Sequence, residues 1–398
     1  MVSSWTWVEL GASLVCLGTW PALLELARRP RKTTSHERCQ HVCFLDYALS
    51  YGVFGLVLLV AASGRDGLGV HVRTIGGTTL CLVAALGGAL LQTGNSCMQE
   101  ALALGCPLTT LLPLEAALCV VIGTTANFSL QPERSDPRLL FSGVALYLVA
   151  ILSSTGAQLT HQFGGGEEAL RGEAGATGAG VPELEPLVVG GGSVDADEIS
   201  PDAIASFRDR TSFRERGRSQ RARTNRRKGL MIGVLGGVAF GFFTPAFNIA
   251  VNDPFSFVAS AEGPHSPLSV TAANMIFALS FTASAVLSQS RSLLKKHEKE
   301  TAASILRARY LGSGGVRRAY AILSGIFCCL GNFLQFHGGK LAGFAAADVV
   351  QAFPLVGTLW GVLLFQDYNH ANRRTIFLLS NTYLFYSGAV ALLGLSAK

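Results

Sequence analysis

The chain has 398 residues, of which 49% are hydrophobic and only 15% are charged. A soluble domain usually carries about 25% charged residues, and the mean hydropathy of this chain is positive. The composition argues against a soluble globular protein. The net charge is +6, and in a membrane protein such an excess of positive residues usually reflects the orientation in the membrane rather than a binding partner.

The cysteines and histidines do not predict a disulfide framework, a metal centre or an enzyme. Nine cysteines are present without disulfide spacing, and seven of them lie in apolar runs, where cysteine behaves as a small hydrophobic residue. Cys39 and Cys43 flank His41, but no second ligand pair follows, so exposed or reversibly acylated thiols are the favoured interpretation. Since Ser/His/Asp and nucleotide-binding constellations are also missing, we expect no metal, no cofactor, no nucleic-acid partner and no enzymatic activity.

Long apolar stretches recur along the chain. A membrane-spanning helix needs roughly 20 mostly apolar residues to cross about 30 Å of hydrocarbon. The first stretch, Trp5 to Ala27, lacks a basic leader and a small-residue cleavage site, so we interpret it as a retained span. The ten predicted spans are residues 5–27, 43–62, 75–97, 106–127, 137–158, 229–251, 268–290, 318–337, 342–366 and 373–395. The sequence therefore predicts an all-α polytopic membrane protein.

A charged segment divides the spans into two groups of five. It opens rich in Gly, Glu and Ala, passes through an acidic patch and ends rich in arginine. Low hydrophobicity and segregated charge are typical of disorder. We expect a first five-helix repeat over residues 1–160, a cytoplasmic, disordered loop over 161–228 and a second five-helix repeat over 229–398.

Basic residues are distributed unequally between the two sides of the predicted bundle. Of the 32 lysines and arginines, 26 lie in the odd-numbered connections. Positive residues favour the cytoplasmic side, so segments 161–228 and 291–317 are expected in the cytoplasm and both termini on the other face of the plasma membrane. With five spans per half, this orientation makes the two halves inverted repeats of each other.

Short motifs recur in the same order in the two halves. Gly94-Asn95 followed by Gln99 in the third span matches Gly331-Asn332 followed by Gln335 in the eighth. Prolines match as well, and each is expected to kink or break its helix because proline removes a backbone donor. These helix-breaking residues are Pro21, Pro113, Pro245 and Pro354. Although proline and glycine are common in membrane helices, paired interrupted helices favour a transporter with its site near the bilayer midplane.

Acidic side chains within spans are candidates for proton coupling, because ionisable groups are costly in hydrocarbon and tend to be functional there. Glu115 follows Pro113 in the fourth span, Asp348 opens the ninth, and Asp46 lies near the start of the second. Burial away from water favours the neutral form of a carboxylic acid, so such a group can take up and release a proton. The alternative for Glu115 and Asp348 is a structural hydrogen bond to a neighbouring helix.

Amide and aromatic side chains lie near the predicted helix breaks. Amides offer both donors and acceptors, and aromatic rings offer surfaces for stacking, which suits planar, neutral, amide-bearing solutes. An ionic substrate would require Arg or Lys deep in the membrane, and these are missing from the interiors of the predicted spans. The candidate substrate-binding residues are Trp20, Asn95, Gln99, Phe247, Asn248, Asn332, Gln335, Gln351 and Trp360.

Longer motifs are similar to those of a known family. They are Leu17-Gly18-Thr19-Trp20-Pro21-Ala22, Phe44-Leu45-Asp46-Tyr47, Val121-Ile122-Gly123-Thr124-Thr125 with Asn127, Pro245-Ala246-Phe247-Asn248 with Asn252-Asp253, Ala345-Ala346-Ala347-Asp348, and Val350-Gln351-Ala352 with Pro354-Leu355-Val356. Together they resemble the ureide permeases of plants over all ten spans, but not over the central loop. The resemblance implies a fold of the drug/metabolite transporter superfamily and proton-coupled uptake of allantoin, uracil, xanthine and related oxo-derivatives of nitrogen heterocycles.

One departure concerns the acid of the fourth span. Plant members tend to place a Thr-Glu pair early in this span, whereas this chain has Thr109-Thr110 and carries its acid at Glu115. The coupling residue and the substrate are therefore less directly transferable from the family to this chain.

Two other functions stay open at this point. One is transport of another small neutral solute, such as a sugar, by the same fold. The other is a membrane receptor or scaffold that transports nothing and signals through its central loop.

Deleting residues 165–225 separates a transporter from a signalling protein. A transporter should retain solute flux because its site lies within the spans, and uptake of labelled solute by cells that express the deleted chain measures this. Loss of a signalling output with no flux in either chain would favour the receptor.

Overall fold

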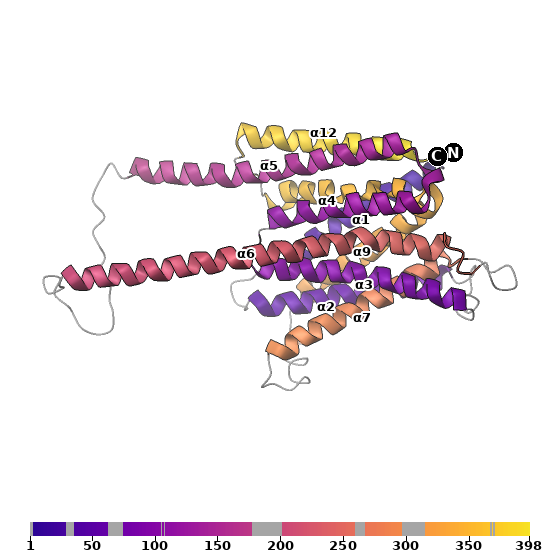
Figure 1. The fold of residues 1–398 in the computed structure, drawn as a ribbon, viewed down its shortest axis with the longest axis horizontal. Coiled ribbons are helices and arrows are strands. Elements are labelled where there is room, and N and C mark those ends of the chain that lie inside the picture. Colours follow the sequence, from indigo (N-terminus) through magenta and orange to yellow (C-terminus); the bar gives the residue numbers. More distant parts are fainter. Residues whose placement is uncertain are drawn as a thin grey trace.

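The protein folds as a bundle of long helices aligned along one axis (Figure 1). The computed structural model describes residues 3–28, 36–62, 75–104, 106, 108–176, 201–258, 267–296, 315–366, 368 and 371–398. In these ranges the only pairing of extended backbone is an isolated bridge between Ser135 and Ala397. The N-terminal and C-terminal ends lie together at one end of the bundle, as an even number of crossings requires.

The helices follow one another in two sets. The first set is α1 (Ser4–Arg28), α2 (His36–Ala62), α3 (Ile75–Ala103), α4 (Leu108–Leu130), the short 3-10 helix η2 (Pro132–Arg134) and α5 (Pro137–Ala176). The second set is α6 (Pro201–Asn252), α7 (Val270–Lys296), α9 (Gly315–Ala342), α10 (Phe344–Ala347), η5 (Asp348–Ala352), α11 (Phe353–Trp360), η6 (Gly361–Phe365) and α12 (Arg373–Ser396).

Each of the ten predicted spans coincides with helical structure. Within the described ranges, nine helical stretches are long and apolar enough to cross a membrane, and α4 contributes a shorter apolar stretch, Leu114–Leu130. The ninth span is built from four consecutive pieces, α10, η5, α11 and η6. The prediction of an all-α polytopic membrane protein is confirmed.

The predicted disordered loop, residues 161–228, is helical at both ends. α5 continues to Ala176 and α6 begins at Pro201, whereas residues 177–200 lie outside the described part of the chain. Proline is well suited to the first helical position, and the arginines and alanines after it are strong helix formers. Residues 161–176 and 201–228 are thus helical in this structure, and the disorder of the loop stays a prediction.

The four matched prolines differ in what they do to their helices. α1 and α6 continue past Pro21 and Pro245, and α4 continues past Pro113, so the chain is not broken at these positions. The ninth span is interrupted: Gly343 has a φ of 93°, and a 3-10 segment separates α10 from α11, in whose first turn Pro354 lies. Proline there removes no helical hydrogen bond, because the first turn leaves its N–H groups unpaired.

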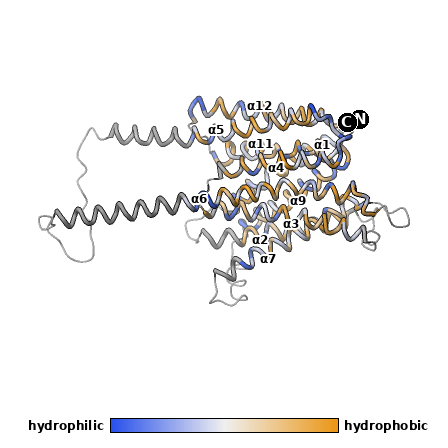
Figure 2. Tube along the Cα trace, in the orientation of Figure 1, coloured by the Kyte–Doolittle hydropathy of each residue, from blue (hydrophilic) through white to orange (hydrophobic). Residues whose placement is uncertain are grey.

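The bundle exposes apolar side chains outward. Trp5, Leu152, Met231 and Leu395 are largely exposed, and Figure 2 shows hydrophobic residues along the bundled helices, with hydrophilic residues toward helix ends. Contiguous exposed apolar surface is rare on soluble monomers. Lipid is therefore the solvent that this surface requires.

Packing relates the two sets of helices in a regular way. α3 packs against α6 as α1 packs against α9, and α4 packs against α6 as α11 packs against α1. The pairs α5–α12 and α2–α7 lie at opposite edges of the bundle (Figure 1). An inverted repeat predicts these matched pairs, although the repeat itself stays a prediction.

Glycines bring α6 unusually close to α4. A Cβ atom at Gly241 would lie 2.6 Å from the Cβ atom of Ile122, and one at Gly237 would lie 3.0 Å from that of Leu118. Small residues at such four-residue spacing let the backbones of membrane helices approach closely. The α4–α6 contact therefore depends on the missing side chains of these glycines.

Replacing Gly241 by alanine tests this contact. We expect Gly241→Ala to lower the free energy of unfolding by about 1–3 kcal/mol, because the added methyl group must displace Ile122, and to lower the midpoint of thermal unfolding in detergent. Gly11→Ala is the matched control, because an added Cβ at Gly11 meets nothing within 4 Å. It should be neutral or slightly stabilising, since alanine has the higher helix propensity. An equal loss in both variants would contradict the proposed close approach.

Candidate functional site

Four small or polar residues form one face of α4. Glu115, Cys119, Gly123 and Asn127 are four residues apart, so they follow one another along the same side of the helix. We call this set the α4 stripe. It faces α6 and the interrupted ninth span, as the contacts of its members show.

Glu115 is the buried acid at one end of the α4 stripe. Its side chain is 2% exposed, and neither carboxyl oxygen has a hydrogen-bond partner among the described residues. Glycines of α6 provide its surroundings: Cβ atoms built at Gly236 and Gly233 would lie 3.1 and 3.9 Å from Oε1. A buried acid without partners is stable only in its neutral form, so Glu115 is available to a proton or to a donor that enters from outside.

Asp348 is the buried acid near the other end of the α4 stripe. It is the first residue of η5 and accepts a hydrogen bond of 3.3 Å from Nδ2 of Asn127. The same Nδ2 donates to Thr244 on α6, and the Asn127 oxygen accepts from Asn248, one turn further along α6, at 3.2 Å in each case. α4, α6 and the ninth span thus meet in one hydrogen-bonded cluster.

Gln351 connects the middle of the α4 stripe to the same 3-10 segment. Residues three apart lie on one side of a 3-10 helix, so Gln351 and Asp348 both face α4. The Gln351 side-chain oxygen accepts from the Cys119 thiol at 3.5 Å, and Cys119 also approaches the Phe240 carbonyl oxygen at 3.4 Å. The segment therefore lies along α4 for two helical turns.

The cluster extends from Asn248 toward the end of the bundle where the termini lie. Asn252 donates from Nδ2 to the Asn248 oxygen at 2.8 Å. Lys340, near the end of α9, donates to the Asn252 oxygen at 2.6 Å and to the Val251 carbonyl oxygen.

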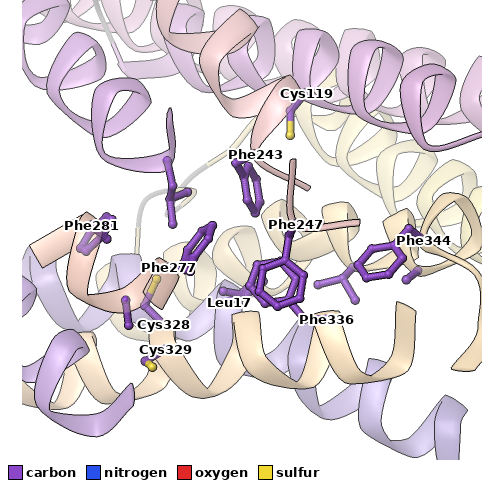
Figure 3. Close-up of a cluster of buried hydrophobic side chains, with 14 of the residues drawn as sticks. Leu17, Cys119, Phe243, Phe247, Phe277, Phe281, Cys328, Cys329, Phe336 and Phe344 are labelled. Atoms are coloured by element: carbon purple, nitrogen blue, oxygen red, sulfur yellow. The ribbon is translucent and has the colours of Figure 1, made fainter. Parts of the chain in front are cut away.

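Aromatic side chains pack beside this cluster. Phe247 stacks on Phe336 with ring centroids 3.6 Å apart and an interplanar angle of 9°. Figure 3 shows the pair between Phe344 on one side and Phe243 and Phe277 on the other, with Cys119 above them. Phe247 is fully buried, so in this conformation its ring faces other side chains.

The two tryptophans that were predicted to bind substrate lie away from the α4 stripe, in or against α1. Trp20 stacks on Tyr47 of α2 with ring centroids 5.2 Å apart. Trp360 of α11 donates from Nε1 to Thr19 at 3.1 Å. These contacts form a second aromatic region around α1 that is separate from the α4 stripe.

The other predicted amides are dispersed. Asn332 of α9 donates to the Tyr51 hydroxyl at 3.0 Å, and Asn95 of α3 donates to Leu91 of its own helix at 3.1 Å. Gln335 is buried with its side-chain oxygen unpartnered among the described residues. Gln99 is partly exposed near the end of α3.

Asp46 has a charged partner. Both of its carboxyl oxygens accept from Arg318 of α9 at 2.8 Å, from Nε and from Nη2. Such a bidentate pair is strong and geometrically specific. Asp46 is therefore better explained as a link between α2 and α9 than as the proton carrier that the sequence predicted.

The structure brings together only part of the predicted set, and it adds members. Asp348, Asn248, Gln351 and Phe247 converge near the α4 stripe, with Glu115 at its far end. The added residues are Cys119, Asn127, Thr244, Asn252 and Lys340. The four-residue spacing of the α4 stripe was a signal that could have identified Asn127, whereas the partners on α6 and α9 depend on packing.

The side chains of His36, Cys39 and His41, which were considered as metal ligands from sequence, lie outside the described part of the chain.

Comparison with known proteins gives the family. The ureide permease family model matches residues 76–163 and 207–396. Ureide permease 4 of Arabidopsis thaliana is 31% identical over 400 residues, which cover 96% of this chain and 94% of the relative. This chain belongs to the ureide permease family. Ureide permease 5 of the same plant is 32% identical over 404 residues, which cover 97% of this permease and 92% of the relative. The probable ureide permease A3 of Vigna unguiculata is 29% identical over 385 residues, which cover 91% of this permease and 95% of the relative.

Family membership decides between the classes of function considered from sequence. A permease is a membrane transport protein, so the prediction that the chain is not an enzyme is confirmed by its relatives. The resemblance to ureide permeases is confirmed as well.

The Asp46–Arg318 pair can be tested by removing each partner. The Asp46 side chain is 2% and the Arg318 side chain 24% exposed, so Asp46→Asn and Arg318→Gln should each lower the free energy of unfolding by about 2–4 kcal/mol, because each leaves a charge unpaired. The double variant should lose less than the sum of the single losses. Thermal unfolding in detergent measures all three. Additive losses would show that the two residues do not act as a pair.

Proposed function

We propose that this permease is a proton-coupled secondary transporter of ureides and oxo-derivatives of nitrogen heterocycles, such as allantoin, uracil and xanthine. It works in the plasma membrane with residues 161–228 and 291–317 in the cytoplasm and both termini on the opposite face. The observation that carries the proposal is Glu115, a buried acid without a partner among the described residues.

The α4 stripe supports the assignment of protons. An unpaired acid in a low dielectric exchanges a proton more readily than it holds a charge. Asp348, at the Asn127 end, is hydrogen-bonded, and twelve residues of helix separate Asn127 from Glu115, or about 18 Å at 1.5 Å per residue. The two acids therefore lie at different depths, and a rocking motion that exposes each of them to the two sides in turn would let each acid take up a proton on one side and release the same proton on the other.

The chemistry of the surrounding side chains supports the substrate class. Amide groups of Asn127, Asn248 and Gln351 offer donors and acceptors, and the aromatic cluster around Phe247 offers ring surfaces (Figure 3). A planar solute with alternating N–H and C=O groups matches both. The relatives carry the name ureide permease, which points to the same chemical class.

Uptake of labelled allantoin, uracil and xanthine by cells that express the permease tests the substrates. We expect at least one of the three to accumulate when the outside is more acidic than the inside. No uptake of any of them would contradict the substrate class, and uptake that is indifferent to the gradient would contradict proton coupling.

Neutralising the two acids tests their role. A gradient of one pH unit is worth about 1.4 kcal/mol per proton, enough for about tenfold accumulation by a one-proton symporter. Glu115→Gln and Asp348→Asn should lose this accumulation and retain at most exchange of preloaded solute. Glu100→Gln is the control, because Glu100 is an exposed acid at the end of α3, and it should accumulate solute like the parent chain. Full accumulation by both acid variants would exclude these residues as the coupling groups.

A further inference from the structure

A continuous set of hydrogen bonds joins Lys340 to Asp348. Lys340 Nζ donates to Asn252, Asn252 to Asn248, Asn248 to Asn127 and Asn127 to Asp348, over distances of 2.6, 2.8, 3.2 and 3.3 Å. We call the three asparagines the amide chain. Asn127, Asn248 and Asp348 are at most 1% exposed, so water does not compete for most of these bonds.

The direction of the amide chain is fixed by its two ends. A lysine ammonium group has three donors and no acceptor, so the Asn252 oxygen must face it and the Asn252 NH2 group must face Asn248. The same constraint passes along each asparagine, because each oxygen accepts on the Lys340 side and each NH2 group donates on the other. The last NH2 group, on Asn127, requires an acceptor, and an ionised carboxylate offers acceptors only.

We propose that Lys340 is a positioning residue that acts through the amide chain to set the pH at which Asp348 takes up its proton. The inference rests on the proposed coupling role of Asp348 and deepens it. A cation at one end polarises successive hydrogen bonds in the same sense, and the aligned donor at the other end stabilises the ionised carboxylate. Without Lys340, Asn252 is free to turn over, and the carboxylate loses both the field of the cation and the fixed direction of its donor.

Other titratable and charged side chains lie near Asp348 and near Lys340, the two ends of the hydrogen-bonded set. Titratable side chains that face Asp348 or its neighbours from α4, α5 and α12, within the described ranges, are Cys119, Tyr147 and Tyr386. These are neutral near pH 7 in the absence of strong perturbation. The positive charge of Arg134 repels that of Lys340. Glu9 of α1 pairs with His337 of α9 at 2.9 Å. Among these groups, Lys340 alone is joined to Asp348 through the amide chain.

The test is the pH profile of solute uptake. In Lys340→Met, Asp348 should hold its proton more tightly, so half-maximal uptake should move to higher pH by about 0.5–1 unit. Asn252→Asp should move it in the same direction, because its carboxylate still accepts from Lys340 but cannot donate to Asn248. Lys340→Arg keeps a cation with donors only and should restore the midpoint of the parent chain.

A matched control removes a different charge at the same end of the bundle. Arg138 is exposed at the start of α5, and Arg138→Met should leave the midpoint where it is. Uptake is expressed per molecule at the cell surface, and the nearly isosteric Asn252→Asp carries the test if Lys340→Met does not reach the membrane. A midpoint unchanged in both variants, or moved equally by Lys340→Arg or Arg138→Met, would overturn the inference.

Asp348→Asn separates failure of this inference from failure of the proposed function. In that background, exchange of preloaded solute should lose its pH dependence, and adding Lys340→Met should have no further effect on it. If exchange by Asp348→Asn keeps the full pH dependence, the coupling role of Asp348 fails and this inference fails with it. If Asp348→Asn abolishes the dependence while Lys340→Met leaves the midpoint of the parent chain unchanged, only the role of Lys340 fails.

Discussion

Close approach of α4 and α6 across the glycines of α6 is the contact on which the candidate site depends. Lipid is as apolar as the helix surfaces, so helices in a bilayer associate through tight packing and hydrogen bonds. Ile122 and Leu118 occupy the space that side chains at Gly241 and Gly237 would take. This proximity brings Asn127 within hydrogen-bonding distance of Thr244 and Asn248, and it buries Glu115 against backbone rather than against a polar side chain.

The two halves share their packing but not their polarity. When they are aligned on their prolines, Glu115 corresponds to Val356 and Asn248 to Leu24. The matching contact between α1 and α11 is equally close, since a Cβ at Gly18 would lie 2.8 Å from the Phe353 carbonyl oxygen. The polar groups differ, however: the α1–α11 contact carries the Trp360–Thr19 hydrogen bond, whereas the α4–α6 side carries the amide cluster and the unpartnered acid Glu115 among the described residues. Similar packing of the two helix pairs is therefore accompanied by different polar side chains.

Hydrophobic length predicted the spans well because a bilayer imposes a minimum length on every helix. The same criterion could not place the ends of α5 and α6, since helix propensity outside the membrane does not require apolar residues. Candidate acids were found because ionisable residues are rare at depth, yet sequence could not separate Glu115, which is unpartnered among the described residues, from Asp46, which Arg318 binds. Lys340 was not among the residues predicted from sequence, because its partners come from α6, almost ninety residues earlier in the chain.

The 3-10 segment that carries Asp348 has a mechanical consequence. A 3-10 helix rises about 2.0 Å per residue with three residues per turn, against about 1.5 Å and 3.6 in an α-helix. If the five residues of η5 rewound to α-helix, the ninth span would shorten by about 2.5 Å and one end would rotate by about 100° relative to the other. Such a screw motion would carry the Asp348 carboxyl group away from Asn127 while Phe353 and the rest of α11 stayed packed on α1. The interrupted span thus contains a short 3-10 segment whose rewinding to α-helix would change the position of one buried acid.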